Sequence, residues 1–280
     1  MPADEQSRFL QELAEDLNSK NIQLPSFPDV VINIRTALED PTCRAERLAS
    51  VVTTDPVLVA RLLMAANSAF HNRAGIEIID LNLAISRLGF EVVRNTAITL
   101  AVEQIFAASE HEALRDAIEQ IWNSSLSLAS MSFVIARNAG NVNPDNAFLC
   151  GLLHEVGRLY ILTKAAHYPK LMGDPEALKN LQDQWYASVG KSIIEAWGFS
   201  GEIADSLGSG DDIDDRGNTA ATMVDVVLLA KLLLRGIEDA ADDSAFPGPA
   251  RKLNISANAL PSITAAYDLH AQSMRQSVGR

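Results

Sequence analysis

The chain has 280 residues, of which 48% are hydrophobic, and it carries a formal net charge of -13. Its length and hydrophobic content suffice for one large globular domain or two small ones, and they exclude a chain that is disordered throughout. The negative charge repels the phosphates of nucleic acids, and no stripe of Lys and Arg with interleaved aromatic residues opposes that repulsion, so we expect no nucleic-acid partner.

The N-terminal segment, residues 1–17, contains no basic stretch followed by an apolar one, so it does not have the pattern of a signal peptide. The apolar and polar residues of this segment alternate instead with the period of a helix over residues 4–17. We therefore expect the chain to begin with a helix and the protein to be cytoplasmic.

Residues 55–70 show the helical period most clearly, and no segment alternates convincingly with a period of two, so we predict an all-α fold. Asn67 and Ser68 interrupt this apolar helix near its predicted C-terminal end. One interpretation is that they cap carbonyl groups that the helix leaves free. The other is that they contact a partner protein.

Helix starts are predicted where Asp or Asn precedes Pro, at Asp55, Asn143 and Asp174, because the side chain caps the helix and the proline ring suits its first position. Gly89 is predicted to end one helix in the left-handed conformation, with the next helix starting at once. The other predicted helices cover residues 29–38, 44–52, 81–88, 91–106, 112–138, 144–165, 176–197, 219–238 and 262–277.

Composition shifts weakly near residue 107, which predicts two packed helical lobes, residues 1–107 and residues 108–280. A turn is expected at residues 24–28 and a loop rich in Gly and Asp at residues 208–218. The longest apolar run, residues 223–234, is shorter than the roughly 20 residues that cross a bilayer, so we expect no membrane partner. Both cysteines are expected to be free thiols, since two are too few for a disulfide framework.

Four stretches, in this order and spacing, resemble one known family: LPSFPDVVINIRTALEDP, LASVVTTDPVLVARLLMAANSAFH, LNLAISRLGFEVVRNTAI and GLLHEVGRLYIL. The chain with these motifs resembles the HDOD family, the HD-related output domain of bacterial signalling proteins, a degenerate branch of the HD phosphohydrolase superfamily. The resemblance covers about residues 17–215. It implies two packed helical subdomains, the second a degenerate HD-domain or PDEase-like fold, and a regulatory role without established catalysis.

The resemblance also implies that most of the HD metal ligands are missing. An HD site needs several His and Asp ligands from different helices to hold a divalent ion that activates water. Ser124 stands where a ligand His would follow Trp122 by two positions, and Glu155 follows His154 where the pattern has Asp. We therefore expect no catalytic residues, no bound metal and no cofactor.

Two interpretations of the HD remnant stay open. In the structural one, Glu155 and Arg158 form an ion pair along the helix, while His154 hydrogen-bonds a neighbouring helix. In the functional one, His154, Glu155, Arg158 and Ser124 mark a pocket in which Arg158 and His154 bind a small anion such as a nucleotide phosphate.

We predict a non-catalytic regulatory or output module of bacterial signal transduction that acts by contact with other signalling proteins. One alternative is a metal-dependent phosphohydrolase of nucleotides or cyclic nucleotides with an atypical HD site. The other is a sensor that binds a small anion or nucleotide. Input and output are expected to come from separate molecules or from self-association, so a homo-oligomer is compatible with the prediction.

Overall fold

The computed structural model describes residues 3–19, 28–107, 114–199, 201–208, 220–236 and 248–278. Within these ranges every regular element is a helix, which confirms the all-α prediction. None of the helices found there is long and apolar enough to cross a membrane. The elements are α1 (Ala3–Ser19), α2 (Asp29–Leu38), α3 (Ala45–Val52), α4 (Pro56–Asn67), α5 (Leu81–Leu88), α6 (Phe90–Ala107), α7 (Arg115–Ala139), α8 (Pro144–Leu153), α9 (Val156–Ala165), α10 (Pro169–Met172), α11 (Pro175–Ala196), α12 (Gly201–Gly208), α13 (Met223–Leu234), α14 (Gly248–Lys252), η2 (Ala257–Ala259) and α15 (Leu260–Val278).

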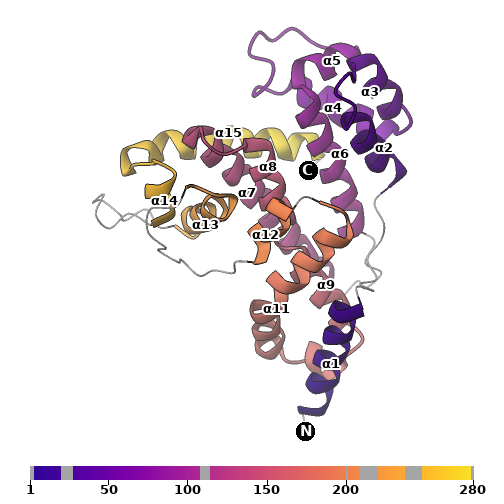
Figure 1. Ribbon diagram of the computed structural model, residues 1–280, viewed down its shortest axis with the longest axis vertical. Coiled ribbons are helices and arrows are strands. Elements are labelled where there is room, and N and C mark those ends of the chain that lie inside the picture. Colours follow the sequence, from indigo (N-terminus) through magenta and orange to yellow (C-terminus); the bar gives the residue numbers. More distant parts are fainter. Residues whose placement is uncertain are drawn as a thin grey trace.

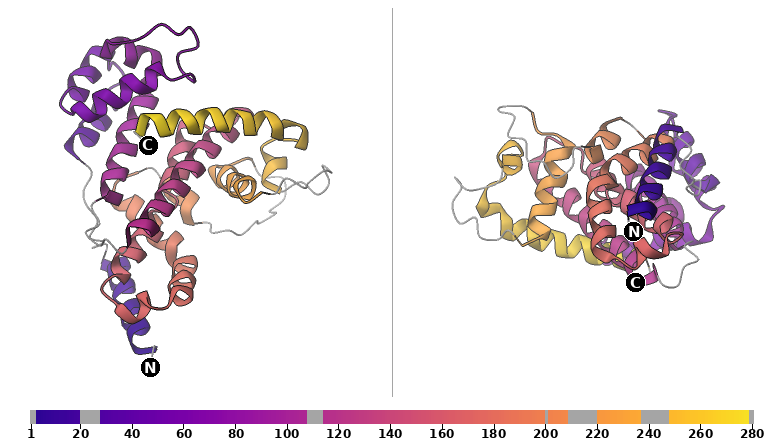
Figure 2. Two further views of the ribbon diagram at one scale, coloured as in Figure 1. Left: turned by 180° about the vertical axis from the view of Figure 1, so that it is seen from behind. Right: turned by 90° about the horizontal axis from the view of Figure 1, so that it is seen from below.

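The helices fall into an upper group and a larger body (Figure 1). Helices α2 to α5 gather at one end, and α6 runs from them into the body, where α7 and α8 pack along each other. The C-terminal helix α15 packs across both α7 and α4, so the end of the chain joins the two groups. The view from behind in Figure 2 shows α15 in the same position, crossing the body close to α6.

Helix α1 lies apart from the upper group, at the opposite end of the molecule (Figure 1). Its Phe9 side chain is fully buried and meets the Tyr168 ring edge to face, with 5.3 Å between ring centroids. The Tyr160 hydroxyl donates a hydrogen bond of 2.6 Å to Asp16. The sequence division puts this helix in the first lobe, and in the structure these contacts join it to α9 and to Tyr168, which follows α9.

The three predicted N-terminal caps are confirmed. The Asp55 carboxylate accepts hydrogen bonds from the backbone N–H groups of Val57 and Leu58 at 2.9 and 3.1 Å, and Asn143 and Asp174 cap α8 and α11 in the same way. These side chains satisfy donors that a helix start leaves free. The local sequence alone therefore determines where these three helices begin.

Gly89 has the predicted positive φ, 82°, and α6 begins at the next residue. Its ψ of 163° differs from the expected left-handed helical conformation and lies in a region essentially restricted to glycine. The sequence missed the short helices α10, α12 and α14, because one or two turns show little periodicity. Except for Pro28 and Gly208, the turn expected at residues 24–28 and the loop expected at 208–218 lie outside the described residues.

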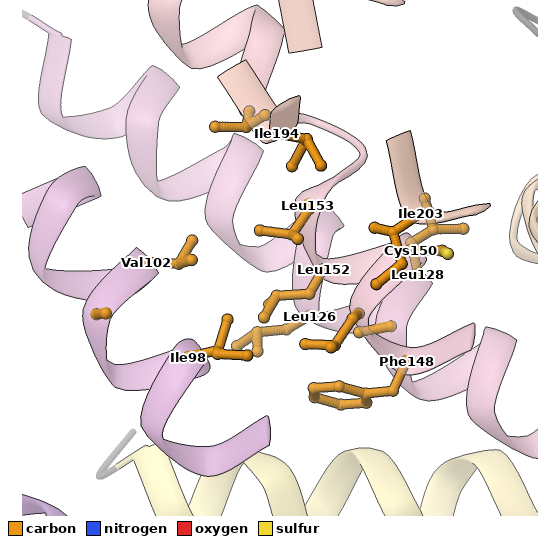
Figure 3. Close-up of a cluster of buried hydrophobic side chains, with 14 of the residues drawn as sticks. Ile98, Val102, Leu126, Leu128, Phe148, Cys150, Leu152, Leu153, Ile194 and Ile203 are labelled. Atoms are coloured by element: carbon orange, nitrogen blue, oxygen red, sulfur yellow. The ribbon is translucent and has the colours of Figure 1, made fainter. Parts of the chain in front are cut away.

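The largest contact between helices is that of α7 with α8. Gly151 makes it possible, because a Cβ atom at this position would lie 2.7 Å from the backbone of Ala129. Around this contact, leucine and isoleucine side chains from α6, α7, α8, α11 and α12 interdigitate (Figure 3). Cys150 is a free, fully buried thiol of this core, and burial raises its pKa to about 12. Cys43, also free, is half-buried.

Candidate functional site

The helix predicted over residues 144–165 is interrupted at its centre. Helix α8 ends at Leu153, and α9 begins at Val156, after Glu155 adopts φ -93° and ψ 2°. The backbone N–H of His154 donates to the carbonyl of Gly151, three residues earlier, at 3.3 Å. This tighter turn separates the two helices at the HD-like motif, and no Gly or Pro marks the break itself, so the periodicity of the sequence did not reveal it.

Gly157 brings α9 into backbone contact with α11. A Cβ atom at this position would lie 2.0 Å from the carbonyl oxygen of Tyr186 and 2.8 Å from the backbone nitrogen of Gly190. Only glycine permits this approach, since real Cβ contacts are longer than 3.0 Å. The close approach holds the interrupted turn against the side chain of Tyr186.

Tyr186 is the centre of the site. The buried His154 ring meets it edge to face, with 5.6 Å between ring centroids. The guanidinium carbon of Arg158 lies 4.3 Å from the centroid of the tyrosine ring, within the range of a cation–π interaction. The Lys231 ammonium donates a hydrogen bond of 3.0 Å to the tyrosine hydroxyl and lies 5.3 Å from the ring centroid. Tyr186 thus contacts one histidine and two cations.

Arg158 is held by two carboxylates. Its Nε lies 2.8 Å from Glu155, and its Nη1 lies 2.7 Å from Asp183, which Lys179 also contacts at 2.6 Å. Burial acts to raise the pKa of Asp183, but hydrogen bonds and charges from Lys179 and Arg158 outweigh it, and the pKa lies below its usual value. The predicted pair of Glu155 and Arg158 is confirmed, although both side chains are mostly buried rather than on an open surface.

The residues at this site do not fit a divalent ion. The guanidinium of Arg158 and the ammonium of Lys231, which share Tyr186 with His154, have no lone pair to offer a metal. The Glu155 carboxylate is already engaged by Arg158. In the part of the chain that the structure describes, no group of three His, Cys, Asp or Glu side chains is arranged to hold a metal ion.

Of the four residues predicted to mark the HD remnant, the structure brings together His154, Glu155 and Arg158. Ser124 lies on the exposed side of α7, while the next residue, Ser125, is fully buried. The sequence missed the partners that complete the site, Asp183 and Lys231. The only signal for Lys231 was that a charge interrupts an otherwise apolar run, which is typical of a side chain with a buried partner.

Asn67 and Ser68 are both engaged within the chain. The Asn67 amide donates to the carbonyls of Leu63 and Ile78 at 2.9 and 2.7 Å, and its oxygen accepts from the backbone N–H of Ile78 at 2.8 Å. The buried Ser68 hydroxyl accepts a hydrogen bond of 2.9 Å from the Ser273 hydroxyl of α15. This geometry favours the structural interpretation, in which Asn67 fastens the segment between α4 and α5.

Replacing Asn67 with alanine is expected to lower the free energy of unfolding by about 2–3 kcal/mol, because it removes four hydrogen bonds, two of which bind the backbone groups of Ile78. Urea denaturation measures this change. The matched control is Asn138→Ala, which removes one hydrogen bond to the carbonyl four residues earlier from an exposed position. Equal losses in the two variants would contradict the fastening role.

Comparisons with known proteins identify the family of the chain and structures that share its fold. The model of the HDOD domain family matches residues 24–211. A crystal structure from Shewanella amazonensis, of a protein provisionally named a metal-dependent phosphohydrolase, superposes with a TM-score of 0.78 at 20% identity, covering 97% of this chain and 99% of that one. An HDOD domain protein of unknown function from Geobacter sulfurreducens gives a TM-score of 0.70 at 24% identity, covering 96% and 99%. At these identities the two structures support the fold alone.

A longer relative also matches. An uncharacterised protein of Treponema pallidum is 20% identical over 242 residues, which covers 81% of this chain and 45% of the relative. The chain therefore spans less than half the length of that protein. The family match, by contrast, includes the upper helices α2 to α5 and the interrupted turn at His154.

Proposed function

The chain belongs to the HDOD domain family, which is associated with signal transduction, and on this basis we propose that it is a non-catalytic, cytoplasmic regulatory module that acts by contact with other signalling proteins. The family match extends over well more than half of the chain. Its fold is the helical fold of the Geobacter sulfurreducens HDOD protein. The non-catalytic role and the mode of action go beyond these comparisons and depend on the site and the surface.

One observation carries the non-catalytic part of the proposal: Arg158 and Lys231 both contact the Tyr186 ring that faces His154. HD-type catalysis requires a metal cation to acidify water and to neutralise phosphate charge. Arg158 and Lys231 share the Tyr186 ring with His154 and cannot act as metal ligands, and Glu155 is engaged by Arg158, so a metal would have to break this ion pair to gain an acidic ligand. The charge arrangement therefore supports a structural role for the site.

The same contacts weaken the alternative of an anion sensor. Glu155 and Asp183 place two carboxylates on the Arg158 guanidinium. An incoming phosphate would have to displace at least one of them and would be repelled by the other. Lys231 is also engaged, by the Tyr186 hydroxyl. Both cations of the cluster thus have partners among the described residues, which an incoming anion would have to displace.

A surface suited to protein contact lies on the upper group of helices. Ile76, Ile79 and Leu83 are 68%, 82% and 61% exposed, and they follow one another along the segment between α4 and α5 and the first turn of α5. This segment projects from the end of the molecule (Figure 1). Scattered exposed apolar residues are ordinary, but neighbouring ones mark interaction surfaces. Asn67 holds the segment in place, so the surface is formed before a partner arrives.

Site-specific photo-crosslinking in the native cells tests the contact. A photoreactive amino acid at Ile79 is expected to give one defined protein adduct, which Leu83→Glu in the same chain abolishes. The matched control carries the photoreactive residue at Gln120, which is exposed on α7. Absence of an adduct from position 79, or the same adducts from both positions, would contradict contact through this surface. An adduct with a second copy of the chain would identify self-association as the output.

A further inference from the structure

A partly enclosed pocket lies away from the His154 site, where residues after α4 meet α6, α7, α8 and α15. Its cavity volume is about 40 Å³, more than the roughly 10–15 Å³ that one water molecule needs. Asp145, near the start of α8, lines the pocket, while His154 follows the end of the same helix. Along the helix the two residues are therefore roughly 13 Å apart.

Half of the residues that line the pocket carry aromatic rings. The His270 ring stacks on Phe133, with 4.5 Å between ring centroids and an interplanar angle of 19°. Phe70 and Phe148 meet the same histidine edge to face, at 5.0 and 6.1 Å. Burial lowers the pKa of His270 to about 3, so its ring is neutral at pH 7. The faces of such rings attract cations and planar groups.

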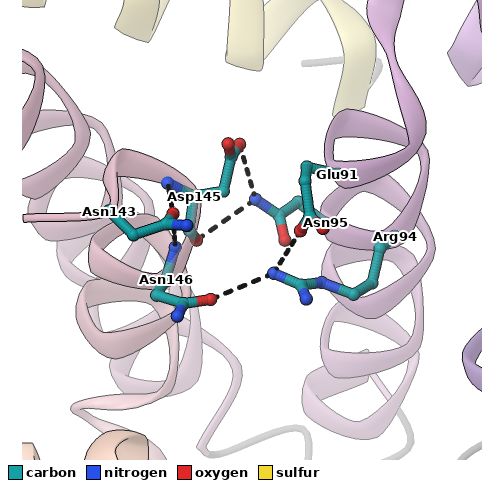
Figure 4. A network of polar contacts seen from close by, with 6 residues as sticks. All are labelled: Glu91, Arg94, Asn95, Asn143, Asp145 and Asn146. Atoms are coloured by element: carbon teal, nitrogen blue, oxygen red, sulfur yellow. Dashed lines mark hydrogen bonds and ion pairs between the residues drawn. The ribbon is translucent and has the colours of Figure 1, made fainter. Parts of the chain in front are cut away.

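Three polar groups of the pocket have few or no hydrogen-bond partners among the described residues. In the described part of the chain the Asp145 carboxylate accepts a single long hydrogen bond, of 3.3 Å from the Asn95 amide (Figure 4). The carboxylate points toward α15, the yellow ribbon of Figure 4. Nδ1 of His270, which is 6% exposed, and the oxygen of Asn95 are buried without a hydrogen-bond partner among the described residues. Buried polar atoms of this kind ordinarily have partners.

The charges around the pocket also favour the binding of a cation. Burial and then the neighbouring Glu91 raise the pKa of Asp145, because both oppose its negative charge. Arg94 acts in the other direction, but it pairs with Glu91 at 2.6 Å and donates to Asn146 at 3.2 Å. Arg137, whose guanidinium lies over the Phe70 ring, carries a positive charge that opposes a bound cation. Its side chain is exposed, so solvent screens this charge.

From these observations we propose that the pocket binds a small planar organic cation of the amidinium or guanidinium class. The N–H groups along one edge of the ligand donate to the Asp145 carboxylate, and its flat face lies against the phenylalanine rings and His270. Carboxylates and amidinium-like groups match as paired, charge-assisted hydrogen bonds. The test of this site is separate from that of the proposed function, since the pocket includes no residue of the His154 cluster and none of the exposed Ile76, Ile79 and Leu83.

Three probes of one shape test the proposal: acetamidinium, acetamide and acetate carry charges of about +1, 0 and -1 at pH 7. They are titrated into the whole isotope-labelled chain and followed by NMR. We expect saturable shifts for acetamidinium, centred on residues around Asp145 and His270. Acetamide should bind at least about tenfold more weakly, and acetate should show no saturation up to about 100 mM. The titration extends to this concentration because a ligand of four heavy atoms binds weakly.

Two variants make the test specific. Asp145→Asn should weaken acetamidinium binding at least about tenfold, which corresponds to the loss of one charge-assisted contact. Asp116→Asn is the matched control, because Asp116 occupies the same position in α7 as Asp145 in α8 but is exposed. The Asp116→Asn variant should bind acetamidinium as tightly as the wild type does. Met274→Phe, which fills the cavity, gives a second loss that does not depend on Asp145. No saturation with acetamidinium, equal binding of acetate, or unchanged binding in Asp145→Asn would overturn the proposal.

Discussion

Replacing Gly157 with alanine is expected to lower the free energy of unfolding by about 3 kcal/mol or more, because the added methyl group cannot fit between α9 and α11. Its Cβ would lie 2.0 Å from the carbonyl oxygen of Tyr186, a backbone atom that cannot move without shifting the helix. The two helices would separate, and His154 and Arg158 would lose their contacts with Tyr186. Urea denaturation followed by circular dichroism measures the loss.

The control for this substitution is Gly173→Ala. Gly173 has an ordinary φ of -77°, and the nearest atom to its added Cβ lies 3.4 Å away. We expect a change within about 1 kcal/mol there, since alanine in place of glycine then acts mainly on the unfolded chain. If Gly157→Ala unfolds at the same urea concentration as Gly173→Ala, α9 and α11 are not in the contact described.

Replacing Arg158 with alanine is expected to lower the free energy of unfolding at pH 7 by about 2–4 kcal/mol, because it leaves Glu155 without its cation and removes the nearer of the two cations on the Tyr186 ring. The side chain of Glu155 is 12% exposed, so its charge would remain largely desolvated. Asp183 is 42% exposed and contributes less, since water replaces the lost contact. Urea denaturation at several pH values measures both the size and the origin of the effect.

Acid should reduce the difference between the wild type and Arg158→Ala. The pKa of Asp183 is lower in the folded chain than its ordinary value, so its ion pairs stabilise the fold at neutral pH, and this stabilisation is lost as pH falls below about 4. Lys179→Ala, which removes the 72% exposed partner of Asp183, is the control and should change stability by less than about 0.5 kcal/mol. An Arg158→Ala effect as small as that of Lys179→Ala would contradict the structural role of the cluster.

Local rules predicted the parts of the fold that depend on neighbouring residues. The caps at Asp55, Asn143 and Asp174 and the positive φ of Gly89 follow from side-chain chemistry within a few positions. The position of α1 did not follow from such rules. Its apolar face shows that it packs on something, but only tertiary contacts choose between the upper helices and α9.

The candidate site could be predicted only in part for the same reason. His154, Glu155 and Arg158 are neighbours in sequence, and their spacing indicated the ion pair. Lys231 is far along the chain and reaches Tyr186 because α13 packs beside the body. The aromatic pocket draws on five segments, none of which has a recognisable motif by itself. Sites assembled from distant segments require the structure.

The proposed pocket suggests how a small molecule could act on the upper helices. Phe70, on its wall, follows Asn67 and Ser68 in the segment that carries the exposed Ile76 and Ile79. His270, on the opposite wall, belongs to α15, whose Ser273 donates to Ser68. A ligand that contacts both walls would therefore affect the position of the segment that we propose as the partner surface. This link depends on the pocket being a ligand site and on the surface being a partner site.

The most direct test of the non-catalytic proposal combines two assays on the purified protein. Elemental mass spectrometry measures its metal content after exposure to manganese, iron and zinc, and a phosphate-release assay measures turnover of a panel of nucleotides and cyclic nucleotides. The charges of Arg158 and Lys231 beside Tyr186 predict no stoichiometric ion and no turnover. A stoichiometric ion together with turnover that is lost in His154→Ala would contradict this proposal and establish a phosphohydrolase with an atypical HD site.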